Sequence, residues 1–405
     1  STAQLLELAS DTKKLAAVHA ADFPALRESA ELMAKTARDL RLVLPLNPVK
    51  HVENEVSGRY EDWGSALKTL RDALEELVGL LQTQAERDAE LKNAHERARV
   101  ILAGLINWQS EDPPDTPRVR WLETTLSSLL LHTTPLSIGA LFGGKLAERA
   151  QAWILTSATL SVGGDFTHLR ARLGISADAA TLSVDSPFDY PRQGVLYVPT
   201  GLPTPNTPEF TRAVVDAALP VLELSRGRAF LLFTSLRAME AARGLLTEAF
   251  QERGWDYPLF VQGDAPKNRL LKHFQDSGNG VLLGSQSFWE GVDVPGDALT
   301  VVVIDKLPFQ PPDDPVVAAR ISDAEKNGRS AFATIQLPHA AISLKQGAGR
   351  LIRTETDRGV LMICDTRLAD KPYGKTLLRA LPNMTRTRKL DIVARFFAAQ
   401  AQAAA

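Results

Sequence analysis

The chain has 405 residues, of which 44% are hydrophobic and 23% are charged, a composition that suits two or three ordinary soluble domains. It has no apolar run approaching the ~18 residues of a membrane-spanning helix, so no membrane partner is expected. The formal net charge of −2 excludes a global basic surface for nucleic acid, although a local groove can hold a strand without one.

Cysteine and histidine usage restricts the chemistry further. The single cysteine, Cys364, lies in an apolar run, which predicts a buried thiol. One cysteine cannot form a disulfide or ligate an iron–sulfur cluster within these residues. The histidines lack paired metal-ligand spacing, so no metal site is expected, and a cytoplasmic protein is the simplest interpretation.

Residues 1–110 carry helical patterns. Between Glu61 and Asn107 there is no proline, and Ala, Leu, Glu and Arg abound, which predicts a long helix or a helical hairpin. Leucines recur there at helical spacing, at Leu67, Leu70, Leu74, Leu77 and Leu81. A breaker at 45–48 divides the region, and a polar linker at 111–117 ends it. We expect a helical subdomain that packs on itself.

From Arg118 the pattern becomes rich in β-forming residues, first at 119–122 and 129–131. From about residue 150, apolar strands alternate with helices, such as those expected at 237–253 and 331–344. The expected buried strands are 153–155, 194–198, 229–233, 281–283, 301–304 and 360–363. Buried strands that alternate with helices predict an α/β fold with a parallel sheet covered on both faces.

The string from Gly139 to Leu146 nearly spells a phosphate-binding P-loop. It has the first glycine and the Gly-Lys pair, but Leu146 stands where a Ser or Thr hydroxyl would hold magnesium. The residues before it form only a weak candidate for the buried strand that a P-loop leaves. We therefore expect a surface turn before a short helix.

Two segments place small hydroxyl residues after expected strands. Ser157 and Thr159 follow the strand expected at 153–155, where ligand chemistry gathers in open α/β sheets. Thr234 and Ser235 follow the strand at 229–233, with Ser235 as a natural helix N-cap. Helix-start amides and two hydroxyls would suit one strand phosphate, although a plain strand–cap–helix junction is the favoured explanation of the second segment when it is taken by itself.

A third segment, 284–296, follows the strand at 281–283 and combines three glycines, hydroxyl residues and two acids. Such a loop allows close backbone approach to phosphates. Its Trp289 either stacks on a base or anchors the loop in the core. The fourth segment, 346–353, contains Gln346, Arg350 and Arg353. If it is helical, both guanidiniums share one face, as charge stabilisation of a γ-phosphate requires; a solvated surface pair is the alternative.

In order and spacing these segments resemble motifs III to VI of superfamily 2 helicases, most closely the DinG/YoaA/XPD group of 5′-to-3′ DNA helicases, over residues 118–395. The most specific matches are Phe288-Trp289-Glu290-Gly291-Val292-Asp293 and Leu344-Lys345-Gln346-Gly347-Ala348-Gly349-Arg350-Leu351-Ile352-Arg353; Leu307-Pro308-Phe309, Asp314-Pro315, Asp357-Arg358-Gly359 and Asp365-Thr366-Arg367 continue the pattern. The resemblance implies a RecA-like parallel sheet, helicase lobe two, preceded by an α-helical arch-like subdomain.

The resemblance also implies domain limits. Residues 1–115 would be the arch-like insert, 116–185 the tail of the first motor lobe with motif III, and 186–397 the second RecA-like lobe. The family's P-loop, its Asp-Glu-Ala-His box and any iron–sulfur cysteines would lie upstream, in an absent motor lobe that is one expected partner. We therefore expect the C-terminal part of an ATP-dependent helicase that cannot hydrolyse ATP by itself.

The resemblance assigns roles to individual residues. Arg350 and Arg353 would act as arginine fingers, and Gln346 would couple the nucleotide to closure of the lobes. The residues expected to contact or respond to ATP are Glu290, Gly291, Asp293, Gln346, Arg350 and Arg353; those expected to touch the DNA backbone are Thr234, Ser235, Ser285 and Ser287; those expected to couple the two sites are Ser157 and Thr159. ATP and Mg²⁺ would be held mainly by the absent lobe.

The expected substrate is single-stranded DNA, and the expected setting is DNA repair or replication, with proteins of those processes as further partners. Two alternatives stay open at this point. An RNA-directed translocase would carry the same motifs, and a non-catalytic scaffold could keep the lobe-two fold. The arginine pair and the acidic loop count against a scaffold, which needs neither.

Overall fold

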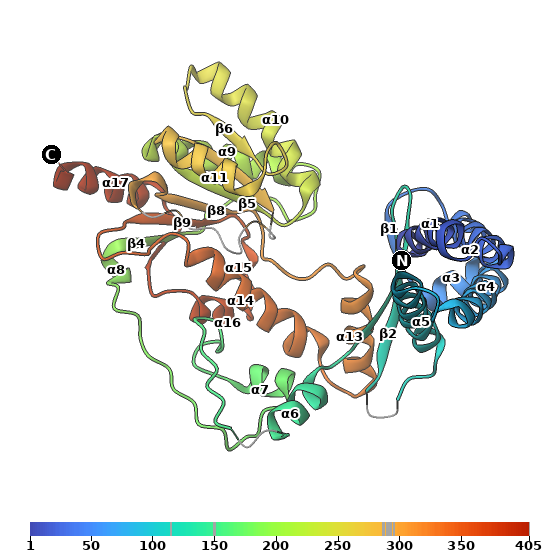
Figure 1. Ribbon diagram of the computed structural model, residues 1–405. Helices are drawn as coiled ribbons and strands as arrows, with labels where there is room; N and C mark the ends of the chain where they lie inside the picture. Colours follow the sequence, from blue (N-terminus) through green and yellow to red (C-terminus); the bar gives the residue numbers. More distant parts are fainter. Residues whose placement is uncertain (114–115, 149–150, 286–287, 289–293, 295, 405) are drawn as a thin grey trace. The chain divides into compact units, whose positions relative to one another are not determined.

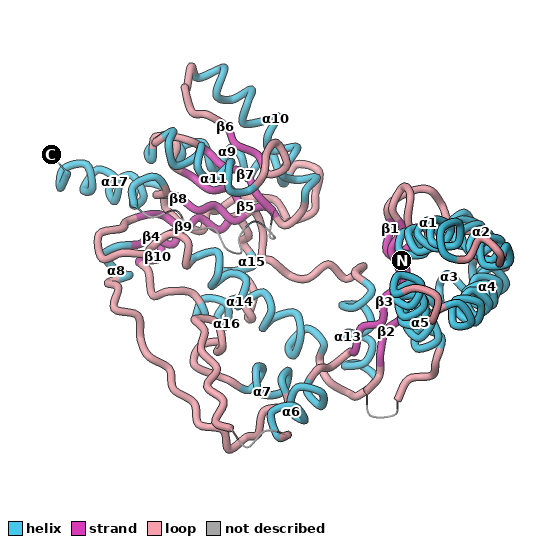
Figure 2. The backbone as a smooth tube through the Cα atoms, in the orientation of Figure 1, coloured by secondary structure: helices cyan, strands magenta, loops and turns pink. Residues whose placement is uncertain are grey.

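The computed structural model describes residues 1–113, 116–148, 151–285, 288, 294 and 296–404. The chain divides into two compact units, Ser1–Lys145 with Pro311–Gly328, and Leu146–Gln310 with Arg329–Ala405. Figure 1 shows the elements coloured along the chain, and Figure 2 separates helices, strands and loops. None of the helices in the described part of the chain combines the length and apolar composition that crossing a bilayer requires.

The first unit is a helical bundle with a small sheet. Its helices are α1 (Thr2–His19), α2 (Pro24–Leu42), α3 (Glu53–Arg59), α4 (Asp62–Gln84), α5 (Ala89–Gln109) and α6 (Gly139–Ala147). Its strands are β1 (Val49–Val52), β2 (Arg118–Thr124) and β3 (Leu129–Pro135), paired antiparallel in that order. The predicted strands at 119–122 and 129–131 are confirmed.

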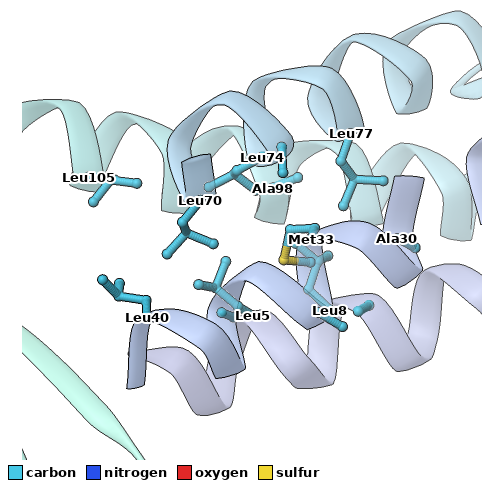
Figure 3. Packing of buried hydrophobic residues seen from close by; sticks show 14 of the residues in the cluster. Leu5, Leu8, Ala30, Met33, Leu40, Leu70, Leu74, Leu77, Ala98 and Leu105 are labelled. Atoms are coloured by element: carbon cyan, nitrogen blue, oxygen red, sulfur yellow. The ribbon is translucent and has the colours of Figure 1, made fainter. Parts of the chain in front are cut away.

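The predicted hairpin is α4 followed by α5, with Asp88 capping α5 by accepting the Glu90 amide at 2.7 Å. Every leucine of the predicted stripe is at most 5% exposed. In Figure 3, Leu70, Leu74 and Leu77 of α4 point towards side chains of α1, α2 and α5. Each such leucine contributes about 1.5–3 kcal/mol by leaving water, which explains why this region holds together as a bundle.

The P-loop-like string forms helix rather than a phosphate loop. Residues 139–147 are helical throughout as α6, and the preceding β3 belongs to an antiparallel sheet. A P-loop needs non-helical glycines whose amides point at the phosphate. A helix thus stands where the sequence predicted a surface turn before a short helix.

Helix α13 (Pro315–Lys326) returns the chain to the first unit. Asp314 caps it by accepting the amides of Val316 and Val317 at 3.0 and 3.2 Å. Asp314 also pairs with Lys50 at 3.3 Å, and the Arg320 guanidinium donates to the Leu136 carbonyl at 3.0 Å. These contacts join α13 to the ends of β1 and β3.

The second unit is built on a seven-stranded sheet in the order β10-β4-β9-β8-β5-β7-β6, and every pairing in it is parallel. The strands are β4 (Gly194–Tyr197), β5 (Ala229–Phe233), β6 (Leu259–Val261), β7 (Val281–Ser285), β8 (Val301–Ile304), β9 (Gly359–Ile363) and β10 (Thr385–Thr387). The sheet therefore contains five of the predicted strands, and two short strands that were not predicted, β6 and β10.

Helices cover both faces of this sheet, as predicted. One face packs against α11 (Lys267–Ser277), α14 (Leu337–Ala348) and α16 (Gly374–Ala380), and the other packs against α9 (Phe210–Ser225), α10 (Leu236–Arg253) and α17 (Leu390–Ala404). Along β5, Phe230 and Leu232 point to the first face, while Leu231 and Phe233 point to the second. The alternation is that of a central strand buried on both sides.

Short helical segments complete the unit. They are α7 (Thr167–Leu173), α8 (Tyr190–Gln193), α15 (Arg367–Asp370), the 3₁₀ turn η1 (Gly296–Ala298) and the π-helical turn η2 (Phe332–Gln336), which precedes α14 directly. The helix predicted at 331–344 is thus present, but it begins with a π-helical turn. Cys364 is fully buried beside β9, as its apolar surroundings predicted.

The prediction of a buried strand at 153–155 is wrong. Trp153, Ile154 and Leu155 lie in irregular backbone and are 47%, 84% and 38% exposed. A parallel strand needs neighbours for its amides and carbonyls. The described residues supply no strand beside this segment. Its apolar sequence is that of a strand, but a partner sheet decides whether it forms one.

Candidate nucleic-acid and nucleotide interfaces

Three neighbouring strands of the sheet end side by side. The register aligns Phe233 of β5 with Ser285 of β7, and Leu232 of β5 with Ile304 of β8. Because the strands are parallel, the residues at these ends meet at the same edge of the sheet. Thr234, Ser285 and Asp305 therefore form a polar row, which brings together two of the predicted DNA contacts.

Ser235 is the N-cap of α10, as predicted. Its hydroxyl oxygen accepts the Ala238 amide at 3.2 Å. This bond satisfies one of the free amides at the helix start and fixes the backbone where the chain leaves β5. The hydroxyl proton of Ser235 is not used by the cap, so it can donate to a ligand at this edge of the sheet.

Ser285 is held by a residue that the sequence did not single out. Both its amide and its hydroxyl donate to the side-chain oxygen of Gln262, at 2.7 and 2.9 Å. Gln262 directly follows β6, the short strand that was also not predicted. The edge of the sheet that would meet a nucleic-acid strand is therefore ordered by side-chain bonds between successive strand ends.

Asp305 is the second residue that the sequence analysis missed. It follows β8, is 3% exposed, and accepts the amides of Thr234 and Lys306 at 3.0 and 2.7 Å, as well as the Thr234 hydroxyl at 3.4 Å. Burial raises the pKa of this carboxyl to about 7, against the opposing effect of those donors. An acid directly after an apolar strand was the available signal.

The raised pKa of Asp305 predicts a pH-dependent stability. The folded state binds a proton that the unfolded chain, with an ordinary aspartate pKa, releases at lower pH. The free energy of unfolding should therefore fall as pH rises between about 4 and 7, by up to about 4 kcal/mol from this group. In Asp305→Asn that contribution should vanish, leaving the variant more stable than the parent at pH values above about 7. Urea unfolding across this range measures the effect; parallel pH profiles for both proteins would contradict it.

Four predicted site residues, Ser287, Glu290, Gly291 and Asp293, lie outside the described residues, as does Trp289. Their neighbours Phe288 and Val294 are buried, at 4% and 2% exposure, in the core face shared with α11 and α14.

The two predicted arginine fingers do not lie on a helix. Helix α14 ends at Ala348, so Arg350 and Arg353 belong to the turn that follows. The expectation of a shared helical face is wrong, and Gly347 and Gly349 explain why, since glycines favour the end of a helix. The turn nevertheless brings the two residues together, because the Arg353 Nε donates to the Arg350 carbonyl at 3.4 Å.

Asp357 fixes this arginine-bearing turn. Its carboxylate accepts the amides of Arg353 and Thr354 at 2.7 and 2.9 Å and the Thr354 hydroxyl at 2.7 Å. Burial lowers the pKa of the Arg353 guanidinium, while Asp357 acts in the opposite direction. Arginine starts from so high a value that it keeps its charge, so the turn presents a cation in a partly desolvated setting.

The arginine-bearing turn lies at the amino end of the sheet. Gln193, which precedes β4, donates to the carbonyls of Thr354 and Asp357 at 2.9 and 3.0 Å. The first residue of β9, Gly359, has the Leu351 side chain against it. Arg350 and Arg353 therefore lie at the end of the parallel sheet opposite to Thr234 and Ser285. Gln346 lies on α14, four residues before Arg350, and is partly buried.

Ser157 and Thr159 contact each other rather than any strand of the sheet. Their hydroxyls are 3.2 Å apart, and the Thr159 amide donates to the Ser157 hydroxyl oxygen at 3.2 Å. Both lie in a turn after the exposed segment 153–155. These two contacts hold residues 157–159 in a turn.

Comparison with known proteins supplies the context for this arrangement. The helicase C-terminal domain family matches residues 218–384. The chain is 40% identical over 398 residues to the ATP-dependent DNA helicase YoaA of Escherichia coli K12, covering 98% of this chain and 61% of YoaA. It is 37% identical over 309 residues to the ATP-dependent helicase DinG of Mycobacterium tuberculosis H37Ra, covering 75% of this chain and 45% of DinG.

The chain thus spans about six-tenths of the YoaA relative it matches. Among solved structures, it resembles an XPD helicase with a TM-score of 0.56 and 17% identity, over 96% of this chain and 64% of that one. An apo XPD structure gives 0.57 and 18% identity, over 96% and 72%. The fold is accordingly a RecA-like helicase lobe with a helical unit before it, as in those XPD structures, and in sequence the chain is similar to the helicases YoaA and DinG.

Proposed function

We propose that the chain is the C-terminal part of an ATP-dependent DNA helicase that moves 5′-to-3′ along single-stranded DNA in repair or replication. The observation that carries the proposal is that two polar sites lie at opposite ends of one parallel sheet. Thr234 and Ser285 stand at its carboxyl edge, and the turn with Arg350 and Arg353 stands at its amino edge. Similarity to YoaA, an ATP-dependent DNA helicase, supports the choice of DNA over RNA.

The proposal assigns the three regions as follows. Residues 1–115 form an arch-like insert, 116–185 belong to the tail of a first motor lobe, and 186–397 form the second lobe. The first lobe would supply the P-loop lysine and the magnesium carboxylate, so the isolated chain should not turn over ATP. Any iron–sulfur cluster would lie in that lobe. A cytoplasmic location and contacts with replication or repair proteins are further parts of the proposal.

In this mechanism ATP lies between the lobes. Its γ-phosphate draws Arg350 and Arg353 inward, with Gln346, Glu290 and Asp293 responding to the nucleotide. Thr234, Ser235, Ser285 and Ser287 hold the DNA backbone, and Ser157 and Thr159 link the first lobe to it. Hydrolysis releases the arginines, so alternate closing and opening of the lobes moves the strand.

The strand-contact part is tested on the chain itself. Replacing Thr234 by valine together with Ser285 by alanine removes two hydroxyls from this edge. Each hydroxyl exchanges its bond to Asp305 or Gln262 when it donates to a phosphate, so the expected net loss is about 0.5–1.5 kcal/mol for each. Affinity for a labelled oligothymidylate should fall by about tenfold or more. Thr247→Val with Ser176→Ala is the matched control, because both hydroxyls are exposed and lie away from this edge.

Each outcome decides between the candidate functions. Weaker binding in the edge variant alone supports the proposal. Equal affinity for both variants would remove Thr234 and Ser285 as strand contacts. A matched RNA that outcompetes the DNA would support an RNA-directed translocase, and no binding of either strand would leave only a scaffold.

A further inference from the structure

The two carboxylate oxygens of Asp305 have different partners. Oδ1 accepts the Thr234 amide at 3.0 Å and the Lys306 amide at 2.7 Å. Oδ2 faces the Thr234 hydroxyl at 3.4 Å. The amides can only donate, so Oδ1 must remain an acceptor. Oδ2 can instead carry a proton, because a hydroxyl is able to accept as well as donate.

The state of Oδ2 decides what the Thr234 hydroxyl can do for a ligand. When Asp305 is ionised, the hydroxyl donates its one proton to Oδ2 and keeps only lone pairs for other partners. A phosphodiester oxygen also offers only lone pairs, so the two repel. When Oδ2 is protonated, it donates to the Thr234 oxygen, and the hydroxyl proton becomes available to a phosphate. Protonation also removes the negative charge of the Asp305 carboxylate, which would otherwise repel a phosphate bound to Thr234.

Among the described residues, the titratable groups near Asp305 either have other partners or stay neutral. Lys306 is adjacent, but its ammonium donates to the Asn206 side chain at 2.7 Å. Directly after β9, burial raises the pKa of the Cys364 thiol, which therefore stays neutral. The next residue, Asp365, is bound by the Arg367 guanidinium at 2.6 Å.

Tyr197 of β4 also faces this region through Cys364, and burial raises the pKa of its phenol, so it too stays neutral. Burial has already brought the pKa of Asp305 itself to about 7. A small further stabilisation of the protonated form therefore changes its occupancy near neutral pH.

We propose that Asp305 is a positioning residue that takes one proton from solvent onto Oδ2 when a nucleic-acid strand binds, and thereby turns the Thr234 hydroxyl into a phosphate donor. The inference rests on the proposed strand-binding function of this edge. It adds to that function a proton uptake coupled to strand binding, of up to one proton for each Thr234–phosphate contact formed.

The test is the pH profile of DNA affinity. The probe is a labelled oligothymidylate, whose phosphodiesters stay ionised, titrated into the chain at fixed ionic strength between about pH 6 and pH 8. Affinity of the parent chain should fall with rising pH by up to about tenfold more than that of Asp305→Asn. Asparagine keeps the Oδ1 acceptor and places a permanent NH donor at the Oδ2 position, so this variant should bind like the protonated parent at every pH.

Thr234→Val supplies the second measurement. It retains the backbone amide bond to Asp305 but lacks the hydroxyl, so it should bind weakly and lose the excess pH dependence, with or without Asp305→Asn. Histidine titration affects all four proteins alike and cancels in the comparison. A role of Asp305 in folding alone would change affinity without changing the pH slope, and circular dichroism confirms that each variant is folded.

The outcomes separate this inference from the function on which it rests. A steeper pH dependence for the parent than for Asp305→Asn, absent in Thr234→Val, supports it. Strand binding with equal slopes in parent and Asp305→Asn overturns the proton uptake and leaves the strand-binding function standing. Absence of strand binding at every pH overturns both.

Discussion

Replacing Arg350 by alanine is expected to lower ATP turnover of the whole protein by about a thousandfold or more, the effect of removing an arginine finger. A guanidinium stabilises the charge that spreads over the γ-phosphate oxygens in the transition state, and alanine offers no donor. Single-turnover hydrolysis with saturating DNA measures the effect. Affinity for single-stranded DNA should change little, because the Arg350 turn lies at the end of the sheet opposite Thr234 and Ser285.

Two further variants sharpen this result. Arg350→Lys keeps the positive charge but loses the planar two-pronged donor, so it should recover only part of the turnover. Arg395→Ala removes an arginine from the exposed surface of α17 and should leave turnover unchanged. Unchanged turnover in Arg350→Ala would end the finger assignment, and a parallel loss of DNA affinity would point to misfolding of the turn.

Replacing Asp365 by alanine is expected to destabilise the second unit by about 3–5 kcal/mol, as the loss of one partner from a buried ion pair does. Asp365 is fully buried and accepts the Leu307 amide at 2.9 Å, the Arg367 amide at 3.1 Å and the Arg367 guanidinium at 2.6 Å. Alanine leaves a partly buried guanidinium and a buried amide without acceptors.

Denaturant unfolding measures the loss, with Asp391→Ala as the control. Asp391 also pairs with an arginine, Arg395 at 3.3 Å, but its side chain is 64% exposed. That exposed pair should contribute no more than about 0.5 kcal/mol. Equal effects for the two variants would mean that burial of the Asp365–Arg367 pair adds nothing to stability.

The parallel sheet could be predicted because its central strands are continuous apolar runs of β-branched and aromatic residues, such as 229–233 and 301–304. The strands β6 and β10 were missed because each has only three residues and lies at an edge of the sheet, and β10 contains no apolar residue. The opposite error at 153–155 has a related cause. An apolar run specifies a strand only when a neighbouring strand satisfies its backbone.

The residues of the candidate site could likewise be predicted only in part. Local patterns identified Ser235 as an N-cap, since capping depends on adjacent residues. They failed for Asp305 and Gln262, whose roles depend on contacts with Thr234 and Ser285 from other strands. They also failed for the arginine turn, where helical spacing suggested one face but glycines ended the helix. The return of α13 to the first unit depends on tertiary contacts that no local pattern signals.

The central claim is that this chain forms the second lobe of a DNA-dependent ATP motor. It is tested most directly by ATP hydrolysis of the whole protein with and without single-stranded DNA, beside the isolated chain. The account predicts hydrolysis by the whole protein that rises strongly when the strand is added, and none by the chain alone. Hydrolysis that ignores the strand, or an isolated chain that hydrolyses ATP by itself, would contradict it.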